Sequence, residues 1–359
     1  MYAMMNQESD FLKPKITIAI NYLDLALMGE HKDIIQTIFS TSGFNFDEIA
    51  LKIFRFQYVN NEVYQKYVDA IGVQPDKISA LHQIPFLPIR FFKTHKVVST
   101  KFTPQIIFES SGTTETVNSN HFVKEVALYE QSFMAGFKTF YGNIKDWCII
   151  GLLPSYLERQ NSSLVYMAEK LIKESGHKLS GFYLNDFDSL ANALTELENL
   201  QQKALLIGVT FALLDFAEAH PMPLKHITFM ETGGMKGRKR EMVKQEVHDI
   251  LQKAFSVETI HSEYGMTELL SQAYSFGKGI FVTSPTMKVF IRDDEDPLTI
   301  IPPTSNNAKG LINIVDLANI YSCSFIATDD IGVLFPDGKF EVTGRRDTSD
   351  LRGCSLLAV

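Results

Sequence analysis

Hydroxyl side chains surround a glycine in one short segment of the chain, and such a segment can bind phosphate. The segment consists of Ser110, Ser111, Gly112, Thr113 and Thr114. Its hydroxyl donors and exposed backbone N–H groups can surround phosphate oxygens. It is not a Walker sequence, because no Gly-Lys-Ser/Thr follows at the required spacing. A polar surface loop is the alternative interpretation of these residues taken alone.

A second segment combines an aromatic ring, a hydroxyl and a carboxylate within a few residues. It consists of Tyr264, Gly265, Met266, Thr267 and Glu268. The tyrosine can stack on a purine, the threonine can hydrogen-bond a phosphate, and the glutamate can hold Mg²⁺ through a hard oxygen. The nearby histidine at position 261 is interpreted as a packing residue, because no second metal ligand stands at a suitable spacing. A short glycine-containing loop is the alternative.

A glycine pair, Gly233 and Gly234, stands at the end of the apolar run His226–Met230, which predicts a strand. Glycines at the C-terminal end of a strand let a flat ligand approach the backbone closely. A flexible turn from this strand to a helix explains the pair equally well.

Asp-Gly at positions 337–338 lies between two apolar runs and predicts a two-residue hairpin turn. Counting outward from that turn places Phe335 opposite Phe340 and Asp330 opposite Arg345. A cross-strand carboxylate and guanidinium form an ordinary ion pair by default. They can also clamp a ribose, the carboxylate accepting from two hydroxyls while the arginine donates to ribose or phosphate.

The sequence pattern of the elements that must position these residues predicts an α/β fold. Residues 1–100 are largely helical in this interpretation, with an extended Pro85–Pro88 segment near their end. Short β-rich runs then alternate with helix-like stretches, which favours a mostly parallel sheet. About the last sixty residues read as mostly strand. The earlier strands are expected at Gln105–Phe108, Trp147–Leu152, Ala204–Thr210 and His226–Met230, and the helices at Asn161–Glu174, Ser189–Leu200 and Arg240–Phe255.

The composition excludes several classes of protein. With 359 residues and a net charge of −8, the chain can bury a large core but lacks the basic excess of a nucleic-acid binder. The apolar run Ala204–Leu214 is shorter than the ~20 residues of a membrane span, and the N-terminus lacks the pattern of a secretory signal. The cysteines Cys148, Cys323 and Cys354 have neither CxxC nor metal-type spacing, which indicates free thiols in a reducing cytoplasm.

In this order, the candidate segments resemble motifs of the adenylate-forming superfamily, which includes acyl-CoA synthetases, peptide-synthetase adenylation domains and luciferases. The resemblance covers the chain from the hydroxyl-rich loop to the hairpin. Tyr264–Glu268 is similar to the motif Tyr-Gly-x-Thr-Glu, and Gly344–Asp347 to the hinge motif Gly-Arg-x-Asp. Thr328–Asp330 is similar to Thr-Gly-Asp with its central glycine replaced.

The resemblance implies that the chain binds ATP with Mg²⁺ and converts a carboxylic acid into its acyl-AMP. It implies a role for each segment. Phosphates would be held by Ser110, Ser111, Gly112, Thr113, Thr114 and Thr267; Mg²⁺ by Glu268; adenine by Gly233, Gly234 and Tyr264; and ribose by Asp330 and Arg345. Gly265 and Met266 would also belong to the cofactor-binding residues. Glu115 departs from the glycine that the phosphate loop normally has, and the usual lysine does not follow.

The end of the sequence is similar to that of one subgroup, the LuxE-type acyl-protein synthetases of the bacterial luminescence fatty-acid reductase complex. Residues 1–343 are expected to form the adenylating domain and 344–359 a hinge-like tail, without the mobile C-terminal domain of most relatives. In the subgroup a C-terminal cysteine accepts the acyl group, and Cys354 stands in the corresponding position. A thiolate is a strong nucleophile toward a mixed anhydride, and Arg352 can lower the pKa of this thiol if the two side chains meet.

Two alternatives remain open at this stage. The chain can be an AMP-forming coenzyme A ligase whose C-terminal function comes from another chain, or a degenerate nucleotide-binding protein with an altered phosphate loop. In the main interpretation its partners are a carboxylic, fatty-type acid and a downstream acyl-accepting protein or reductase.

Overall fold

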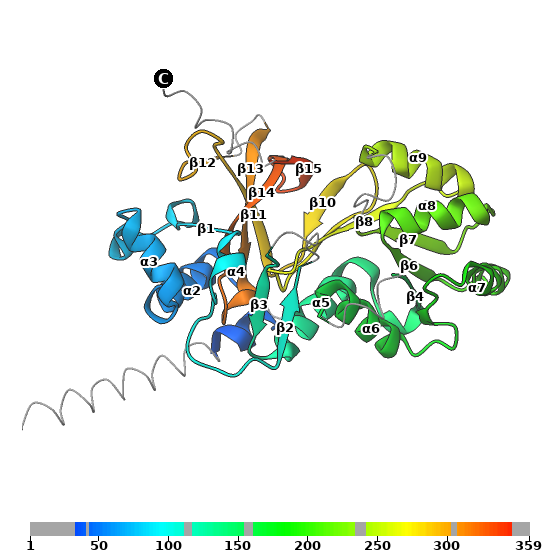
Figure 1. The fold of residues 1–359 in the computed structure, drawn as a ribbon, viewed down its shortest axis with the longest axis horizontal. Helices are drawn as coiled ribbons and strands as arrows, with labels where there is room; N and C mark the ends of the chain where they lie inside the picture. Colours follow the sequence, from blue (N-terminus) through cyan, green and yellow to red (C-terminus); the bar gives the residue numbers. More distant parts are fainter. Residues whose placement is uncertain are drawn as a thin grey trace, which may run out of the picture.

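One large sheet organises the molecule, with helices packed on it (Figure 1). The strands follow the order β12-β11-β13-β14-β15-β10-β9-β8-β7-β6-β4-β5, and β1 pairs with β14. A second sheet contains only β2 and β3. The computed structural model describes residues 33–40, 43–110, 117–153, 161–233, 242–302 and 307–346.

The part of the sheet from β5 to β8 is parallel, as the alternation of strand-like and helical runs predicts. Two of its strands, β4 and β6, are buried along their whole length, which matches the continuous apolar sequence of a strand covered on both faces. The α/β fold class is therefore confirmed. The elements are β4 (Cys148–Leu152), β5 (Gly181–Phe182), β6 (Ala204–Gly208), β7 (Ile227–Glu231), β8 (His261–Tyr264), α6 (Ser163–Ser175), α7 (Phe187–Asn199), α8 (Thr210–Ala219) and α9 (Lys244–Phe255).

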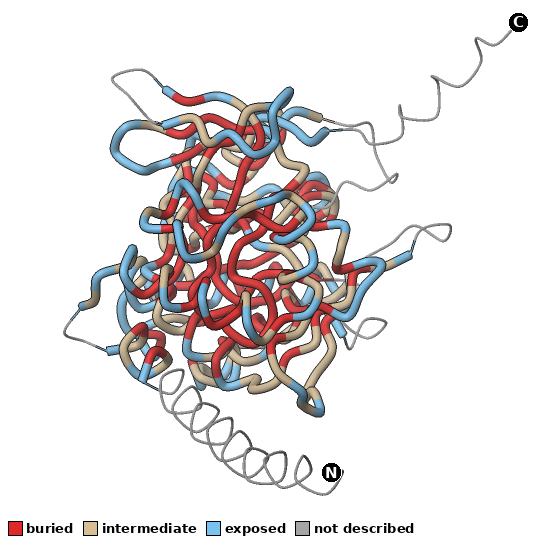
Figure 2. The backbone as a smooth tube through the Cα atoms, turned by 90° about the vertical axis from the view of Figure 1, so that its left-hand side faces the viewer, coloured by how far each residue is buried: buried red, intermediate tan, exposed pale blue. Residues whose placement is uncertain are grey.

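Successive residues of these strands pack into different hydrophobic clusters, because side chains alternate between the faces of a sheet. Ile149 and Leu205 belong to the cluster that contains residues of α5 (Val126–Tyr141) and α6. Cys148 and Leu206 belong to the cluster built with α7, α8 and α9. Figure 2 shows the buried backbone concentrated in the interior, between exposed outer turns.

The other part of the sheet is antiparallel and begins where β8 pairs with β9. It confirms that the described end of the chain is rich in strands. Its strands are β9 (Ala273–Ser275), β10 (Ile280–Thr283), β11 (Met287–Arg292), β12 (Ile300–Ile301), β13 (Ala308–Asp316), β14 (Phe325–Leu334) and β15 (Phe340–Arg345).

The described N-terminal residues are helical, as predicted, and are attached to the antiparallel part of the sheet. Helices α2 (Phe46–Asn60) and α3 (Glu62–Ala70) begin at the capping side chains of Asn45 and Asn61. The proline-rich segment that follows is extended: β1 (Leu87–Pro88) pairs with β14, and the short helix α4 (Phe91–Thr94) follows it. Pro88 has no N–H to donate, which suits this short peripheral strand.

Helices α5 and α8 were not predicted. The buried positions of α5 recur at helical spacing: Leu128, Tyr129, Ser132, Phe133, Gly136 and Phe137. This periodicity was a usable signal, but the helix has apolar residues on most of its surface. Before α5 lies the hairpin of β2 (Ile106–Glu109) and β3 (Asn120–Val123), and only its first strand was predicted.

The predicted turn of the β14–β15 hairpin is wrong by one residue. Phe340 pairs with Leu334 instead of Phe335, because the loop has three residues and only Gly338 has a positive φ, at 82°. Proline at position 336 fixes φ near −65°, which suits a type I turn followed by a left-handed glycine. A bulge at Gly332 then shifts the register back, so that Asp330 still pairs with Arg345 as predicted.

Two of the three cysteines lie in the described part of the chain, and both are free and buried. Cys148 lies in β4, as predicted. Cys323 belongs to the region expected to be mostly strand, but it lies in the short connection before β14. No helix among the described residues has the length and apolar character that crossing a bilayer requires.

Candidate functional site

The aromatic segment and the hairpin meet at the side chains of Tyr264 and Asp330. The Tyr264 hydroxyl donates a hydrogen bond to Asp330 Oδ2 over 2.8 Å. The tyrosine ring contacts Phe281 and Phe340, with centroid distances of 5.8 and 5.4 Å. β8 and β14 are separated in the sheet by β9, β10 and β15, so only the curvature and pairing of the whole sheet bring these residues together.

Asp330 is a shielded carboxylate with an exposed arginine beside it. Its side chain is 15% exposed, whereas that of Arg345 is 69% exposed, and Arg345 Nε lies 3.8 Å from Asp330 Oδ1. Burial raises the pKa of Asp330, and the hydrogen bond from Tyr264 and the charge of Arg345 act against that rise. One carboxylate oxygen is therefore fixed by Tyr264, and the carboxylate retains lone pairs for hydroxyl donors.

Thr267 and Glu268 follow β8 in a loop whose backbone is held by two buried side chains. His121 Nδ1 lies 2.8 Å from the Thr267 carbonyl oxygen, and Asn319 Nδ2 donates to the Glu268 carbonyl oxygen over 2.7 Å. Burial lowers the pKa of His121 to about 4, so the ring is neutral at pH 7 and its Nδ1–H donates. His121 and Asn319 were not predicted as site residues, because neither stands in a recognisable motif.

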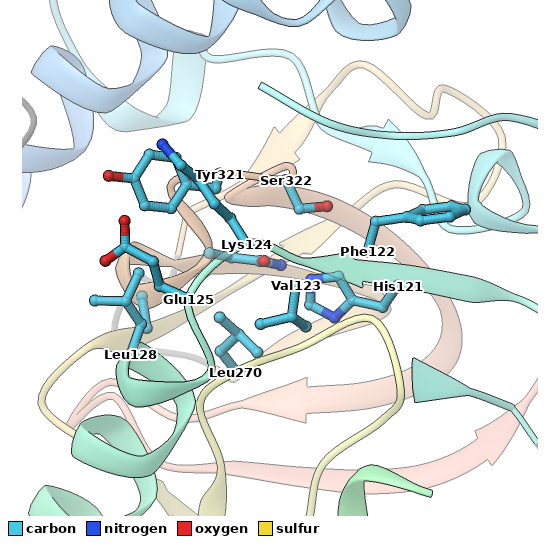
Figure 3. Close-up of a pocket in the computed structure, with 11 residues that line it drawn as sticks. His121, Phe122, Val123, Lys124, Glu125, Leu128, Leu270, Tyr321 and Ser322 are labelled. Carbon is cyan, nitrogen blue, oxygen red and sulfur yellow. The ribbon is translucent and has the colours of Figure 1, made fainter. Parts of the chain in front are cut away.

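A small pocket lies behind this loop (Figure 3). His121 and Asn319 are among the residues that line it, together with Leu270 from the end of the loop. Lys124 lies over the ring of Tyr321 at the pocket, 3.9 Å from its centroid. The pocket belongs to the support of the Thr267–Glu268 loop and contains neither Asp330 nor Tyr264.

The Glu268 carboxyl group is buried, and burial raises its pKa, while a side-chain hydrogen bond with Ser119 lowers it. The described residues contain no cluster of three His, Cys, Asp or Glu side chains that could hold a metal ion. Mg²⁺ usually keeps several waters and binds through one or two carboxylates plus substrate phosphates. A single glutamate linked through Ser119 to the hydroxyl-rich loop fits that donor set.

Ser119 also connects the hydroxyl-rich loop to Glu268. Ser110 N donates to the Ser119 carbonyl over 3.1 Å, and Ser119 N donates to Ser110 Oγ over 2.9 Å. These bonds close the base of the hairpin loop between β2 and β3. The predicted residues Ser111, Gly112, Thr113 and Thr114 lie outside the described residues.

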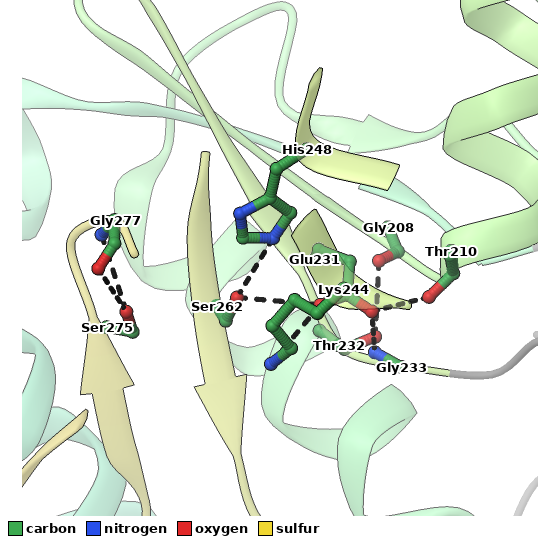
Figure 4. A network of polar contacts seen from close by, with 10 residues as sticks. All are labelled: Gly208, Thr210, Glu231, Thr232, Gly233, Lys244, His248, Ser262, Ser275 and Gly277. Carbon is green, nitrogen blue, oxygen red and sulfur yellow. Dashed lines mark hydrogen bonds and ion pairs between the residues drawn. The ribbon is translucent and has the colours of Figure 1, made fainter. Parts of the chain in front are cut away.

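A buried carboxylate that was not predicted lies at the glycine pair. Glu231 Oε1 accepts hydrogen bonds from Thr210 Oγ1 and, over 2.7 Å, from Gly233 N (Figure 4). Lys244 Nζ lies 3.8 Å from Glu231 Oε2, and Ser262 Oγ lies 3.5 Å from the same oxygen. Gly233 has φ of +78°, a conformation that favours glycine.

The described candidate residues fall into three groups, of which the hydrogen bond of Tyr264 and the ion pair of Arg345 join one at Asp330. One group contains Tyr264 of β8, Asp330 of β14 and Arg345 of β15. A second group, Thr267 and Glu268, lies on the loop that follows β8. Gly233 lies at the end of β7, next to β8 in the sheet. Two further predicted site residues, Gly234 and Cys354, lie outside the described residues.

Comparisons with known proteins point to a single family. The family model described as "Acyl-protein synthetase, LuxE" matches residues 41–358. A protein of Aliivibrio fischeri, the long-chain-fatty-acid–luciferin-component ligase, is 21% identical over 332 residues, which cover 86% of each chain.

Solved structures of adenylate-forming ligases share the fold. ATP-bound MatB from Rhodopseudomonas palustris superposes with a TM-score of 0.51 and 16% identity, over 68% of this chain and 49% of MatB. A 2-hydroxyisobutyryl-CoA ligase in complex with R3-HIB-AMP gives a TM-score of 0.58 and 10% identity, over 83% of this chain and 67% of the ligase. The chain thus spans about half the length of MatB. At these identities the likeness concerns the fold alone.

Proposed function

Because the chain belongs to the LuxE family of acyl-protein synthetases, we propose that it activates a carboxylic acid with ATP and passes the acyl group to Cys354. It is an ATP-dependent ligase, and its acid is of the fatty type, as in the Aliivibrio fischeri relative. The observation that carries this assignment of the site is the hydrogen bond from Tyr264 to Asp330, which joins two motifs 66 residues apart.

In the first step, a carboxylate oxygen of the acid attacks the α-phosphorus of ATP and pyrophosphate leaves. Tyr264 and the backbone at Gly233 and Gly234 hold the adenine, while Asp330 accepts from the ribose hydroxyls and Arg345 donates to ribose or phosphate. Asp330 suits this task because it is shielded from water and already oriented by Tyr264.

The charge of the triphosphate must be neutralised during this step. The loop Ser110–Thr114 and Thr267 supply hydrogen-bond donors, and Glu268 holds Mg²⁺, which supplies charge compensation and Lewis-acid polarisation when bound. The bond network through Ser119 supports this assignment, since it links the hydroxyl-rich loop to Glu268. The hydrogen bonds of His121 and Asn319 to the backbone of the Thr267–Glu268 loop keep these groups in position.

In the second step, a thiolate attacks the acyl carbon, AMP leaves, and a thioester forms; the thiol proton passes to solvent. Burial raises the pKa of Cys148 to about 11 and that of Cys323 to about 12, so both remain protonated and unreactive. This leaves Cys354 as the acceptor within the chain. A further protein or reductase would then take the acyl group from it.

Intact-mass spectrometry after incubation with ATP, Mg²⁺ and a panel of carboxylic acids tests the proposal. The protein should gain the mass of one acyl group, and neutral hydroxylamine should remove it. Cys354→Ser should lose the adduct while keeping ATP–pyrophosphate exchange, because acyl-AMP formation does not use the thiol. The matched variants Cys148→Ala and Cys323→Ala should keep the adduct.

Other outcomes would identify the alternatives. A hydroxylamine-labile adduct in Cys354→Ser would refute the acceptor. A coenzyme A thioester formed at full rate by that variant would indicate a coenzyme A ligase. ATP binding without pyrophosphate release would indicate a nucleotide-binding protein that has lost catalysis.

A further inference from the structure

A group of polar side chains lies near the segment Tyr264–Glu268, on the face of the sheet opposite the Tyr264 side chain. Strand alternation turns Glu263 and Gly265 to that face. Glu263 pairs with Tyr274 across β8 and β9, and Ser284 N donates to the Gln272 carbonyl over 3.0 Å. Residues 263, 272, 274 and 284 therefore share one face, which we call the inner polar cluster.

Helix α5 covers the inner polar cluster at close range. A Cβ atom on Gly136 would lie 3.4 Å from the Tyr274 ring and 3.6 Å from Ser284 Cβ. A Cβ atom on Gly265 would overlap Glu263 Oε1 and lie 3.5 Å from Gln272 Cγ. The two glycines thus let helix α5 and the segment after β8 pack closely against the cluster, and at Gly265 a larger residue would displace Glu263.

Three members of the cluster have polar atoms that the described residues leave without hydrogen bonds. Gln272 is 3% exposed and its Oε1 has no partner, and Ser284 is 2% exposed and its Oγ has none. No hydrogen bond or ion pair from the described residues reaches the Glu263 carboxyl group. Buried polar atoms nearly always have hydrogen-bond partners, so atoms without partners on one face indicate a polar ligand.

The position of the inner polar cluster indicates which ligand this is. In the proposed function, on which this inference rests, the nucleotide occupies the side of Tyr264 and Asp330. The acid reacts at the loop of Thr267 and Glu268. The remainder of the acid must then extend past Gly265, because the opposite face is taken by the nucleotide, and this direction leads to the inner polar cluster.

We propose that Glu263, Gln272 and Ser284 bind a hydroxyl group on the chain of the acid, so that the enzyme prefers a hydroxylated carboxylic acid to an unsubstituted one. The hydroxyl donates to Gln272 Oε1 and accepts from Ser284 Oγ–H or from the Glu263 carboxyl O–H. A plain hydrocarbon at the same position leaves all three groups unpaired.

The state of Glu263 favours a neutral group over a cationic one. Burial raises its pKa to about 8; the neighbouring charge of Glu231 adds to that rise, and Lys244 opposes it. At pH 7 the carboxyl group is therefore protonated and available as a donor. An ammonium group would instead require an ionised carboxylate at this position.

The test compares ATP–pyrophosphate exchange with aliphatic acids of matched chain length that are unsubstituted, hydroxylated or amino-substituted. A hydroxylated acid should have a kcat/KM at least tenfold above its unsubstituted counterpart. Gln272→Leu should reduce that ratio about tenfold by acting on the hydroxylated acid alone. Ser284→Ala, which removes only the hydroxyl, should also reduce the ratio of kcat/KM for the hydroxylated acid over the unsubstituted acid.

The matched control is Gln245→Leu, the same change at an exposed position on α9, and it should leave the ratio unchanged. Equal rates for unsubstituted and hydroxylated acids, or a preference for amino acids, would overturn the inference while leaving the proposed function intact. Calorimetric binding of the hydroxylated acid separates the two proposals if no acid supports exchange. Binding that Gln272→Leu weakens would support the hydroxyl site and refute the proposed function, and no binding would overturn the hydroxyl site.

Discussion

Replacing Asp330 with alanine should weaken ATP binding much more than the binding of inorganic triphosphate. The carboxylate is 15% exposed and is oriented by the Tyr264 hydroxyl over 2.8 Å. A hydrogen bond to a charged, shielded group contributes about 1.5–3 kcal/mol. The loss should therefore be about ten- to hundredfold for ATP, and close to none for triphosphate, which has no ribose.

The ion pair with Arg345 contributes little to this estimate. Arg345 is 69% exposed and its Nε lies 3.8 Å from the carboxylate, so solvent screens the attraction. Tyr264→Phe is the matched control: it removes the hydrogen bond that orients Asp330 but keeps the carboxylate, and it should cost ATP affinity less than Asp330→Ala does.

Calorimetric titration of ATP and of triphosphate into the native protein and both variants measures these effects. Equal losses for both ligands in Asp330→Ala would refute the ribose assignment and indicate that Asp330 acts by holding Tyr264 and Arg345. A larger loss of ATP affinity in Tyr264→Phe than in Asp330→Ala would show that the tyrosine hydroxyl contributes more to ATP binding than the carboxylate does.

Three further predictions follow from buried groups. Glu268→Gln should lower Mg²⁺-dependent pyrophosphate release at least tenfold, or about 1.4 kcal/mol, and activity within twofold of the native rate would remove the metal assignment. Glu263 keeps its proton in the folded state between its ordinary pKa of 4.5 and about 8, while the unfolded chain loses it, so its contribution to the free energy of unfolding falls by about 1.4 kcal/mol per pH unit in that window. Glu263→Gln should therefore become more stable relative to the native protein as pH rises from 5 to 8 in urea denaturation, and a pH-independent difference would contradict the raised pKa. Gly332→Ala should destabilise the protein by at least about 1 kcal/mol in the same assay, because its Cβ would lie 2.5 Å from the Glu341 carbonyl oxygen; an unchanged midpoint would show that the bulge adapts.

The register of the β14–β15 hairpin could be predicted from the local sequence only in part. Asp-Gly correctly indicated a turn, and the pairing of Asp330 with Arg345 is confirmed. The turn itself has one residue more than predicted, and the bulge at Gly332 compensates for it. Turn length depends on the backbone angles of every loop residue, including Pro336, whereas the bulge depends on how β14 packs against its neighbours.

The sequence by itself determined the alternation of strands and helices, because apolar periodicity and turn residues act within a few positions of one another. It also determined the motif residues, since the chemistry of a phosphate, a ribose or a thiol requires particular side chains. Only the tertiary structure decided that Tyr264 meets Asp330 and that His121 and Asn319 hold the backbone of the Thr267–Glu268 loop. It also decided that Gln272 Oε1 and Ser284 Oγ are buried without a hydrogen-bond partner among the described residues. These contacts join residues distant in sequence, and they depend on strand order and helix packing, which local periodicity leaves undetermined.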